Sequence, residues 1–183
     1  ETTMNDAAIL IIDAQDFSKA VSKAGPQEMF QFVNRVLQEL TASVEDAGGT
    51  VIQFTDTGLY AFFPNNPDQA LQAAIAAQKA LQSISLTLAG KEISFGSGIV
   101  CGDLRIGIIG DEERMEIRAV SSEMMFAQSL QKISSTYHLG VLIDEDTMER
   151  LDQVMENIRL FGFINDAKKQ MGLSATLFEE AHP

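Results

Sequence analysis

Apolar residues recur at helical spacing in three long stretches of the chain. The first predicted helix begins at Pro26, because proline fits the first helical turn, and ends at Gly48-Gly49, because glycine favours the backbone conformation that closes a helix. The next two helices are predicted from Pro67 and from about Ser122 to Ile133. A short fourth helix is predicted for Glu145 to Leu151.

Short apolar runs between turn residues predict the strands. Ala7–Ile12 is apolar throughout, which is typical of a strand buried on both faces, and the polar stretch Asp13–Ser18 predicts a turn after it. The other predicted strands are Thr50–Phe54, Leu59–Phe63, Ile93–Cys101, Leu104–Ile109, Leu139–Ile143, Ile158–Ile164 and Ala175–Phe178. Thr55–Gly58 and Gly102-Asp103 are the predicted turns of two hairpins.

The order of these elements predicts the fold class. Strand, helix, strand, strand, helix and strand follow one another as in a ferredoxin-like α+β domain, with helices on one face of a mostly antiparallel sheet. No linker, repeat or low-complexity segment interrupts the order, so residues 1–183 are predicted to form a single domain. Because the first residue is Glu1 and not Met, we expect a fragment of a longer multidomain signalling protein.

Composition and charge narrow the classes of partner. A chain of 183 residues is long enough to bury a core, and its formal charge of −13 disfavours binding to nucleic acid or to an anionic membrane surface. Cys101 is the only cysteine, which excludes an internal disulfide and fits a reducing compartment. We therefore expect a cytoplasmic location, which includes the cytoplasmic part of a membrane-anchored sensor.

Four segments, in order, resemble motifs of class III adenylyl and guanylyl cyclase domains. Gly48–Phe63 matches the family's GGTV-x-KF-x-GDG-L-x-A-x-F hairpin in frame, and Glu112–Glu116 resembles the ERRMEY tongue that helps to build the family's dimer. Leu10–Ser18 and Gly96–Gly110 resemble the opening strand and a hairpin punctuated by glycines. The resemblance implies the ferredoxin-like (βαββαβ) cyclase fold with extra C-terminal strands and a dimerisation tongue.

The resemblance also implies where metal ions would bind. Family cyclases hold two metal ions with two aspartates, and the ions activate the ribose 3′-hydroxyl and neutralise the phosphates. Asp13 keeps the first aspartate, as a vestigial ligand or as a structural turn residue, whereas the second position is Thr57. A single carboxylate bridges two divalent ions poorly. Asp56 is adjacent to Thr57, but a step of one residue is expected to direct its side chain elsewhere.

The remaining family positions also differ from the catalytic pattern. The base-reading pair falls at Gln53, which can still hydrogen-bond a purine edge, and at Arg118, where the family usually carries Asp or Thr. The ribose-orienting and transition-state positions fall at Met125 and Ser129, neither of which can clamp a phosphate. Asp16 stands where the family turn carries glycine, and places a negative charge where a polyphosphate would lie.

The leading hypothesis is a catalytically degenerate cyclase homology domain that serves as a dimerising signal-transduction or regulatory module. No catalytic residue and no cofactor are expected, with Mg²⁺ or Mn²⁺ bound only if residual nucleotide binding exists. The expected partners are a second copy or another cyclase-like domain, bound through the tongue and the helix near Ser122, and an upstream sensory or membrane domain. One alternative is a divergent but active cyclase for ATP or GTP. A second alternative is a domain that binds nucleotide without turnover.

Overall fold

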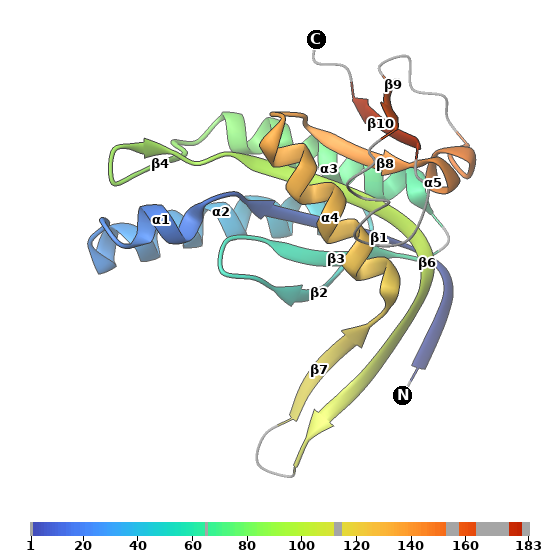
Figure 1. Ribbon diagram of the computed structural model, residues 1–183. Coiled ribbons are helices and arrows are strands. Elements are labelled where there is room, and N and C mark those ends of the chain that lie inside the picture. Colours follow the sequence, from blue (N-terminus) through green and yellow to red (C-terminus); the bar gives the residue numbers. More distant parts are fainter. Residues whose placement is uncertain (1, 65, 112–114, 153–157, 164–175, 181–183) are drawn as a thin grey trace.

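The computed structural model describes residues 2–64, 66–111, 115–152, 158–163 and 176–180. Within them, eight strands form one sheet in the order β2-β3-β1-β6-β8-β10-β9, with β7 paired to β6 (Figure 1). These strands are β1 (Thr2–Ala14), β2 (Thr50–Phe54), β3 (Leu59–Phe63), β6 (Phe95–Gly110), β7 (Met115–Val120), β8 (Val141–Asp144), β9 (Ile158–Phe163) and β10 (Thr176–Glu180). The order β2-β3-β1-β6 is the ferredoxin-like core, which confirms the predicted fold class.

Helices cover both faces of this sheet, so the prediction that they lie on one face is wrong. The long helices α2 (Pro26–Asp46) and α3 (Pro67–Gln82) pack on one face, and α4 (Ser122–Thr136) crosses the other (Figure 1). The alternation of β1 explains both layers, since Leu10 belongs to the core beneath α2 and α3, and Ile11 belongs to the core beneath α4. The prediction that Ala7–Ile12 is a strand buried on both faces is therefore confirmed.

Most of the predicted boundaries agree with the structure. Helices begin at Pro26 and Pro67, β2 and β3 have the predicted limits, and β9 and β10 form the predicted C-terminal pair. Four elements were not predicted: helix α1 (Phe17–Val21), strand β7, and the hairpin strands β4 (Thr87–Leu88) and β5 (Lys91–Glu92). The predicted fourth helix is α5 (Glu145–Glu149). No helix in the described ranges combines the length and the apolar character that a membrane span requires.

The predicted turn at Gly102-Asp103 is wrong. β6 runs unbroken through both residues, because β1 supplies hydrogen-bonding partners on either side of them, with Ala7 opposite Gly102 and Met4 opposite Leu104. The irregularity lies in β1, where the register shifts between Met4 and Ala7 and Asp6 has a φ of 56°. Oδ1 of Asp103 accepts a hydrogen bond of 3.3 Å from the Asp6 backbone N–H, so Asp103 supports this bulge.

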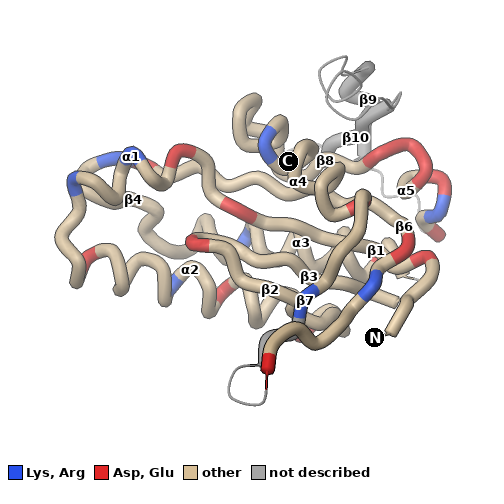
Figure 2. Tube along the Cα trace, turned by 60° about the horizontal axis from the view of Figure 1, so that its bottom comes forward, with Lys and Arg blue, Asp and Glu red and all other residues tan. Residues whose placement is uncertain are grey.

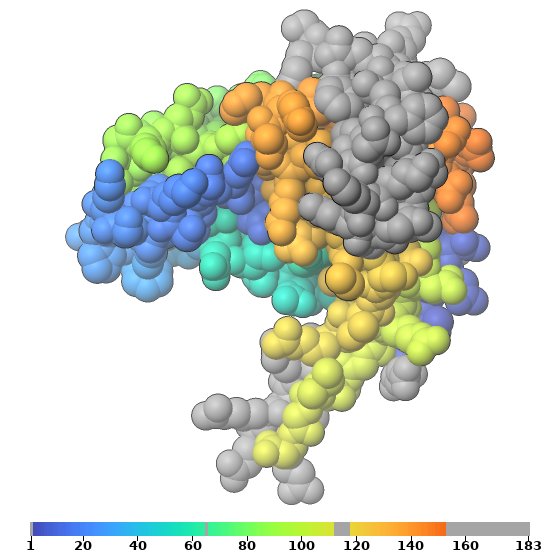
Figure 3. All heavy atoms as spheres, in the orientation of Figure 1, coloured from blue at the N-terminus to red at the C-terminus, as the bar shows by residue number. Residues whose placement is uncertain are grey.

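A two-stranded arm extends from the body of the sheet (Figures 1 and 3). It consists of Arg105–Gly110 of β6 and Met115–Val120 of β7, paired in antiparallel register from Arg105 opposite Val120 to Gly110 opposite Met115. This arm occupies the place of the predicted tongue. Residues 112–114 of the tongue motif lie outside the described residues, and Met115 and Glu116 lie in β7.

Candidate functional site

Asp13 and Thr57 meet at the end of β1. The Thr57 hydroxyl donates a hydrogen bond of 2.8 Å to Oδ1 of Asp13, and the same oxygen accepts 2.8 Å from the Ala14 backbone N–H. Thr57 is only 2% exposed, and Asp13 is half-buried. The structure thus brings together the two residues that the sequence placed at the metal positions, and it joins them by a direct hydrogen bond.

Gly58 allows the turn between β2 and β3 to approach β1 so closely. A Cβ atom at Gly58 would lie 1.9 Å from the Ile12 carbonyl oxygen and 2.9 Å from Oδ1 of Asp13. The turn is closed by a hydrogen bond of 2.9 Å from the Thr55 N–H to the Gly58 carbonyl. Any side chain at Gly58 would therefore push Thr57 away from Asp13.

Asp56, one residue before Thr57, lies on the other side of this turn. It is exposed, and it lines a groove together with Phe17 of α1 and Phe30 of α2. Thr57, by contrast, is buried against Asp13. The step of one residue therefore separates the two side chains, as the sequence led us to expect.

The turn after Asp13 has a conformation that glycine adopts without strain. Asp16 has a φ of 58° and a ψ of 21°, in the left-handed region that disfavours most side chains. Its Oδ1 lies 3.2 Å from Nζ of Lys19, and both side chains are exposed. The departure from glycine noted in the sequence is thus accommodated by an aspartate, which tolerates this region better than most residues.

Gln131 of α4 was not anticipated from the sequence. It is 4% exposed, and its Nε2 donates hydrogen bonds of 2.9 Å to the Asp13 carbonyl and to the Ser135 hydroxyl. The bond to Asp13 attaches α4 to the end of β1, directly at the candidate site. The only sequence signal was an amide within an apolar stripe, which a buried hydrogen bond explains.

Tyr60 is the second unanticipated residue. It lies opposite Ile11 in the pairing of β1 with β3, and it is 8% exposed. Burial of the phenol, and then the negative charge of Asp13, raise the pKa of Tyr60 above its ordinary value near 10. The charge of Asp13 therefore acts within a partly apolar environment and not in open solvent.

The chain is similar to known proteins both in sequence and in structure. No protein-family model matches the chain. The adenylate cyclase, terminal-differentiation specific, of Dictyostelium discoideum is 30% identical over 78% of this chain and 7% of that protein. The adenylate cyclase of Anabaena cylindrica is 27% identical over 78% of this chain and 30% of that protein. The guanylate cyclase domain of RhGC from Catenaria anguillulae, solved in complex with GTP, has a TM-score of 0.83 at 16% identity and covers 100% of both chains.

The chain is a homologue of class III nucleotide cyclase catalytic domains. The likeness to the solved guanylate cyclase domain establishes the fold, and the sequence identity to the two named adenylate cyclases establishes the kinship. This cyclase homologue spans 7% and 30% of the lengths of those two curated relatives.

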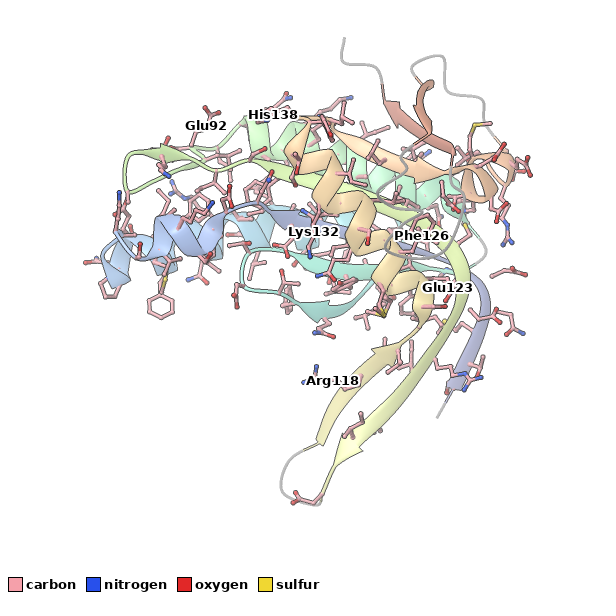
Figure 4. The ribbon with its side chains drawn as sticks, viewed as in Figure 1. Glu92, Arg118, Glu123, Phe126, Lys132 and His138 are labelled. Atoms are coloured by element: carbon pink, nitrogen blue, oxygen red, sulfur yellow. The ribbon has the colours of Figure 1, made fainter. Side chains whose placement is uncertain are left out.

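The other family positions of the cyclase homologue lie on β2, the arm and α4. Gln53 is half-buried in β2, and Arg118 projects from β7 of the arm (Figure 4). Met125 is 64% exposed on α4. Ser129 lies one turn further along α4 and donates a hydrogen bond of 3.2 Å to the Met125 carbonyl. The structure therefore places Met125 and Ser129 together on one turn of α4.

The donor set at Asp13 can be compared with what a pair of Mg²⁺ ions requires. Mg²⁺ prefers anionic oxygen ligands in octahedral geometry, and Asp13 with Thr57 offers one carboxylate and one neutral hydroxyl. No cluster of three or more His, Cys, Asp or Glu side chains suited to a metal ion occurs among the described residues. The residues at these two positions do not fit a two-metal centre.

Proposed function

We propose that this chain is a cyclase homology domain that does not cyclise nucleotides and that acts as a dimerising signal-transduction module. The observation that carries the proposal is the hydrogen bond between Thr57 and Asp13 at the two metal positions of the family. A hydroxyl donor at the second position uses one carboxylate oxygen of Asp13 for structure, and it brings no negative charge to offset a second divalent ion.

The residue types at the other positions support the same proposal. Neither Met125 nor Ser129 carries the charge that stabilises a phosphoryl transition state, and the Ser129 hydroxyl donates to the backbone of its own helix. Loss of one preorganised donor typically slows a reaction about 10²–10³-fold, so loss at several positions leaves little catalysis.

Dimerisation through the arm and α4 is the second part of the proposal. Four apolar side chains on these elements are more than half exposed: Ile108 at 68%, Ile109 at 60%, Val120 at 66% and Met125 at 64%. Of these, Ile109 and Val120 lie on one face of the arm. Exposed apolar groups that gather on one part of a surface are typical of interaction sites. The partner is a second copy or another cyclase-like domain, and a sensory or membrane segment of a longer cytoplasmic signalling protein supplies the input.

Two alternatives make different predictions. A divergent active cyclase would use Asp13 with ligands other than Thr57. A nucleotide-binding domain without turnover would bind ATP or GTP through Gln53 without forming a cyclic product. Titration with fluorescent ATP and GTP analogues separates the second alternative, because only that alternative gives saturable, metal-dependent binding without product.

A cyclisation assay tests the proposal. The purified chain is incubated with ATP or GTP and excess Mn²⁺, cyclic product is detected by mass spectrometry, and the Asp13→Ala variant serves as the control. We expect no product above that of the control from a folded, dimeric sample. Product that disappears in Asp13→Ala would overturn the proposal in favour of a divergent cyclase.

A further inference from the structure

A cavity of about 330 Å³ lies beside the β4–β5 hairpin, at the end of the molecule that carries β4 in Figure 1. Its walls come from the end of α3, the hairpin, the start of β6 and the turn that follows α4. Asp13 and Thr57 are not among the residues that line it. The volume is at the lower end of the range for small-ligand pockets, about 300–1,000 Å³. The cavity is therefore large enough for a small molecule and is separate from the site at Asp13.

The deepest part of the cavity is apolar. Leu81 of α3 and Ile93, which precedes β6, are each 4% exposed, and Leu86 and Phe95 are half-buried beside them. The Ile93 N–H donates a hydrogen bond of 2.8 Å to the Leu86 carbonyl, which fixes the wall formed by the hairpin. A ligand that fills this space therefore needs an apolar body.

Five polar residues complete the lining: Gln78, Gln82, Glu92, Ser94 and His138. Glu92 and Ser94 are two residues apart in an extended segment, so their side chains leave it on the same side. Oγ of Ser94 lies 3.5 Å from Nδ1 of His138, which places Glu92 on the side of the segment that faces His138. Figure 4 shows Glu92 and His138 along the same edge of the molecule. A carboxylate, an imidazole, a hydroxyl and two amides therefore converge on the cavity.

His138 has a backbone conformation that glycine ordinarily adopts. It follows α4 with a φ of 55°, and the Leu139 N–H donates a hydrogen bond of 2.8 Å to the Ser134 carbonyl, as in helices that end in a left-handed residue. A Cβ atom at Gly140 would lie 2.4 Å from Nε2 of Gln78, so the glycine nearby leaves space for an amide of the lining. An imidazole in a disfavoured backbone conformation beside a cavity points to a role for that side chain.

The charges of the lining select the class of ligand. Glu92 supplies a carboxylate, and none of the described residues that line the cavity is a lysine or an arginine. Lys79 and Lys91 adjoin lining residues in the sequence, but both are exposed and neither lines the cavity. An anion would therefore meet a carboxylate with no cation to bind it. An ammonium group would find that carboxylate and the oxygen atoms of two amides.

We propose that this cavity binds a small organic amine, with the ammonium group at Glu92 and His138 and the apolar body against Leu81 and Phe95. Such a site adds a small-molecule input to the proposed signalling module, and it does not depend on dimerisation.

The backbone joins this cavity to the turn after Asp13. Ala14 pairs with Phe95, and the Gln15 N–H donates a hydrogen bond of 2.9 Å to the Ser94 carbonyl. An amine in the cavity therefore contacts the segment that is hydrogen-bonded to this turn.

Titration of the chain with phenethylamine, followed by calorimetry and by the amide signals in NMR spectra, tests the site. We expect saturable binding, with the largest shifts at Gln78, Ser94 and His138. Phenethyl alcohol and phenylacetate, which replace the ammonium group by a hydroxyl or a carboxylate, should bind at least about tenfold more weakly. Figure 2 shows acidic residues gathered around α5, at the other end of the molecule from β4. Shifts centred there would indicate attraction of charge alone and would overturn the proposal.

Two variants and a matched control complete the test. Glu92→Gln changes an exposed residue, so it is expected to fold, and it should weaken phenethylamine binding about tenfold. His138→Gly should raise the Tm, because glycine suits the left-handed backbone, and should still weaken binding several-fold. Asp56→Asn, the control, removes the carboxylate from the apolar groove beside Phe30 and should leave the affinity unchanged. Unchanged affinity in Glu92→Gln or His138→Gly, or an equal loss in Asp56→Asn, would overturn this site and leave the proposed function intact.

Discussion

The hydroxyl of Thr57 lies 2.8 Å from Oδ1 of Asp13 and donates a hydrogen bond to it. With the bond of 2.8 Å from the Ala14 N–H, that carboxylate oxygen has two protein donors. The pair therefore stabilises its own buried turn with one negative charge. A metal site built from two aspartates would instead need cations to offset two charges.

Replacing Thr57 by Val removes the donor while keeping the shape of the side chain. We expect Thr57→Val to lower the free energy of unfolding by about 1–2 kcal/mol, because a hydrogen bond to a charged group is lost at a buried position. Urea denaturation at pH 7 measures the change, with Thr57→Ser as the variant that keeps the hydroxyl. A Thr57→Val protein as stable as the wild type would show that the bond contributes nothing.

Replacing Thr57 by Asp places a second carboxylate beside Asp13. Without metal we expect a loss of about 2–4 kcal/mol, because two like charges then share a largely buried site. Mn²⁺ should recover part of that loss and raise the Tm of the variant, and it should leave the wild-type Tm unchanged. Thermal unfolding with Mn²⁺ or EDTA compares the two proteins. Equal responses to Mn²⁺ would contradict the assignment of these positions.

Tyr60 provides an optical probe of the Asp13 charge. The chain has two tyrosines, and Tyr137→Phe leaves Tyr60 as the only phenol. Burial and the Asp13 charge raise the pKa of Tyr60, so an alkaline absorbance titration should find it ionising above pH 10. Asp13→Asn should lower that pKa, without returning it to the ordinary value, because burial is the larger cause.

The raised pKa of Tyr60 also determines how its contribution to the free energy of unfolding changes with pH. The folded chain holds the Tyr60 proton more tightly than the unfolded chain, so the contribution of Tyr60 is complete below pH 10 and is lost as the pH rises through the folded pKa. A Tyr60 that titrates together with free tyrosine would exclude the burial and the charge effect assigned to it.

Asp144 gives a second test by pH. Burial raises the pKa of this helix-capping carboxyl, whose Oδ1 accepts 3.3 Å from the Thr147 N–H. The folded state therefore favours the protonated form, and the contribution of Asp144 falls as the pH rises from its unfolded pKa through its folded pKa. Asn caps a helix about as well as Asp, so Asp144→Asn should become more stable relative to the wild type over that window. The urea midpoints of wild type and Asp144→Asn, measured from pH 4 to 7, test this. If the difference between the two midpoints stayed constant over that range, Asp144 would not contribute to the pH dependence of stability.

Local patterns in the sequence were enough to predict most of the fold. Pro26 and Pro67 mark helix starts, and the uniformly apolar Ala7–Ile12 marks the central strand, because these signals depend on neighbouring residues. Gly102-Asp103 misled the prediction because the same dipeptide suits a turn or a long strand. The pairing with β1, almost a hundred residues away in sequence, decides between them.

The residues of the candidate site also divide into those that local motifs predict and those that only long-range contacts bring together. Asp13 and Thr57 could be matched in advance because each lies in a segment with a family motif. Gln131 could not, since its hydrogen bond to the Asp13 carbonyl joins residues 118 positions apart. The groove at Phe30 was equally hidden, because an aromatic residue in an amphipathic helix is ordinarily assigned to the core.

The measurement that bears most directly on the central claim is the number of cyclic nucleotide molecules that each chain forms with saturating ATP or GTP and Mn²⁺. Wild type, Asp13→Ala and the combined variant Thr57→Asp, Met125→Asn, Ser129→Arg are compared after verified folding and dimerisation. The account predicts that wild type and Asp13→Ala both stay below one product per chain, and that any activity appears only in the combined variant. Repeated turnover by the wild type, abolished in Asp13→Ala, would contradict it.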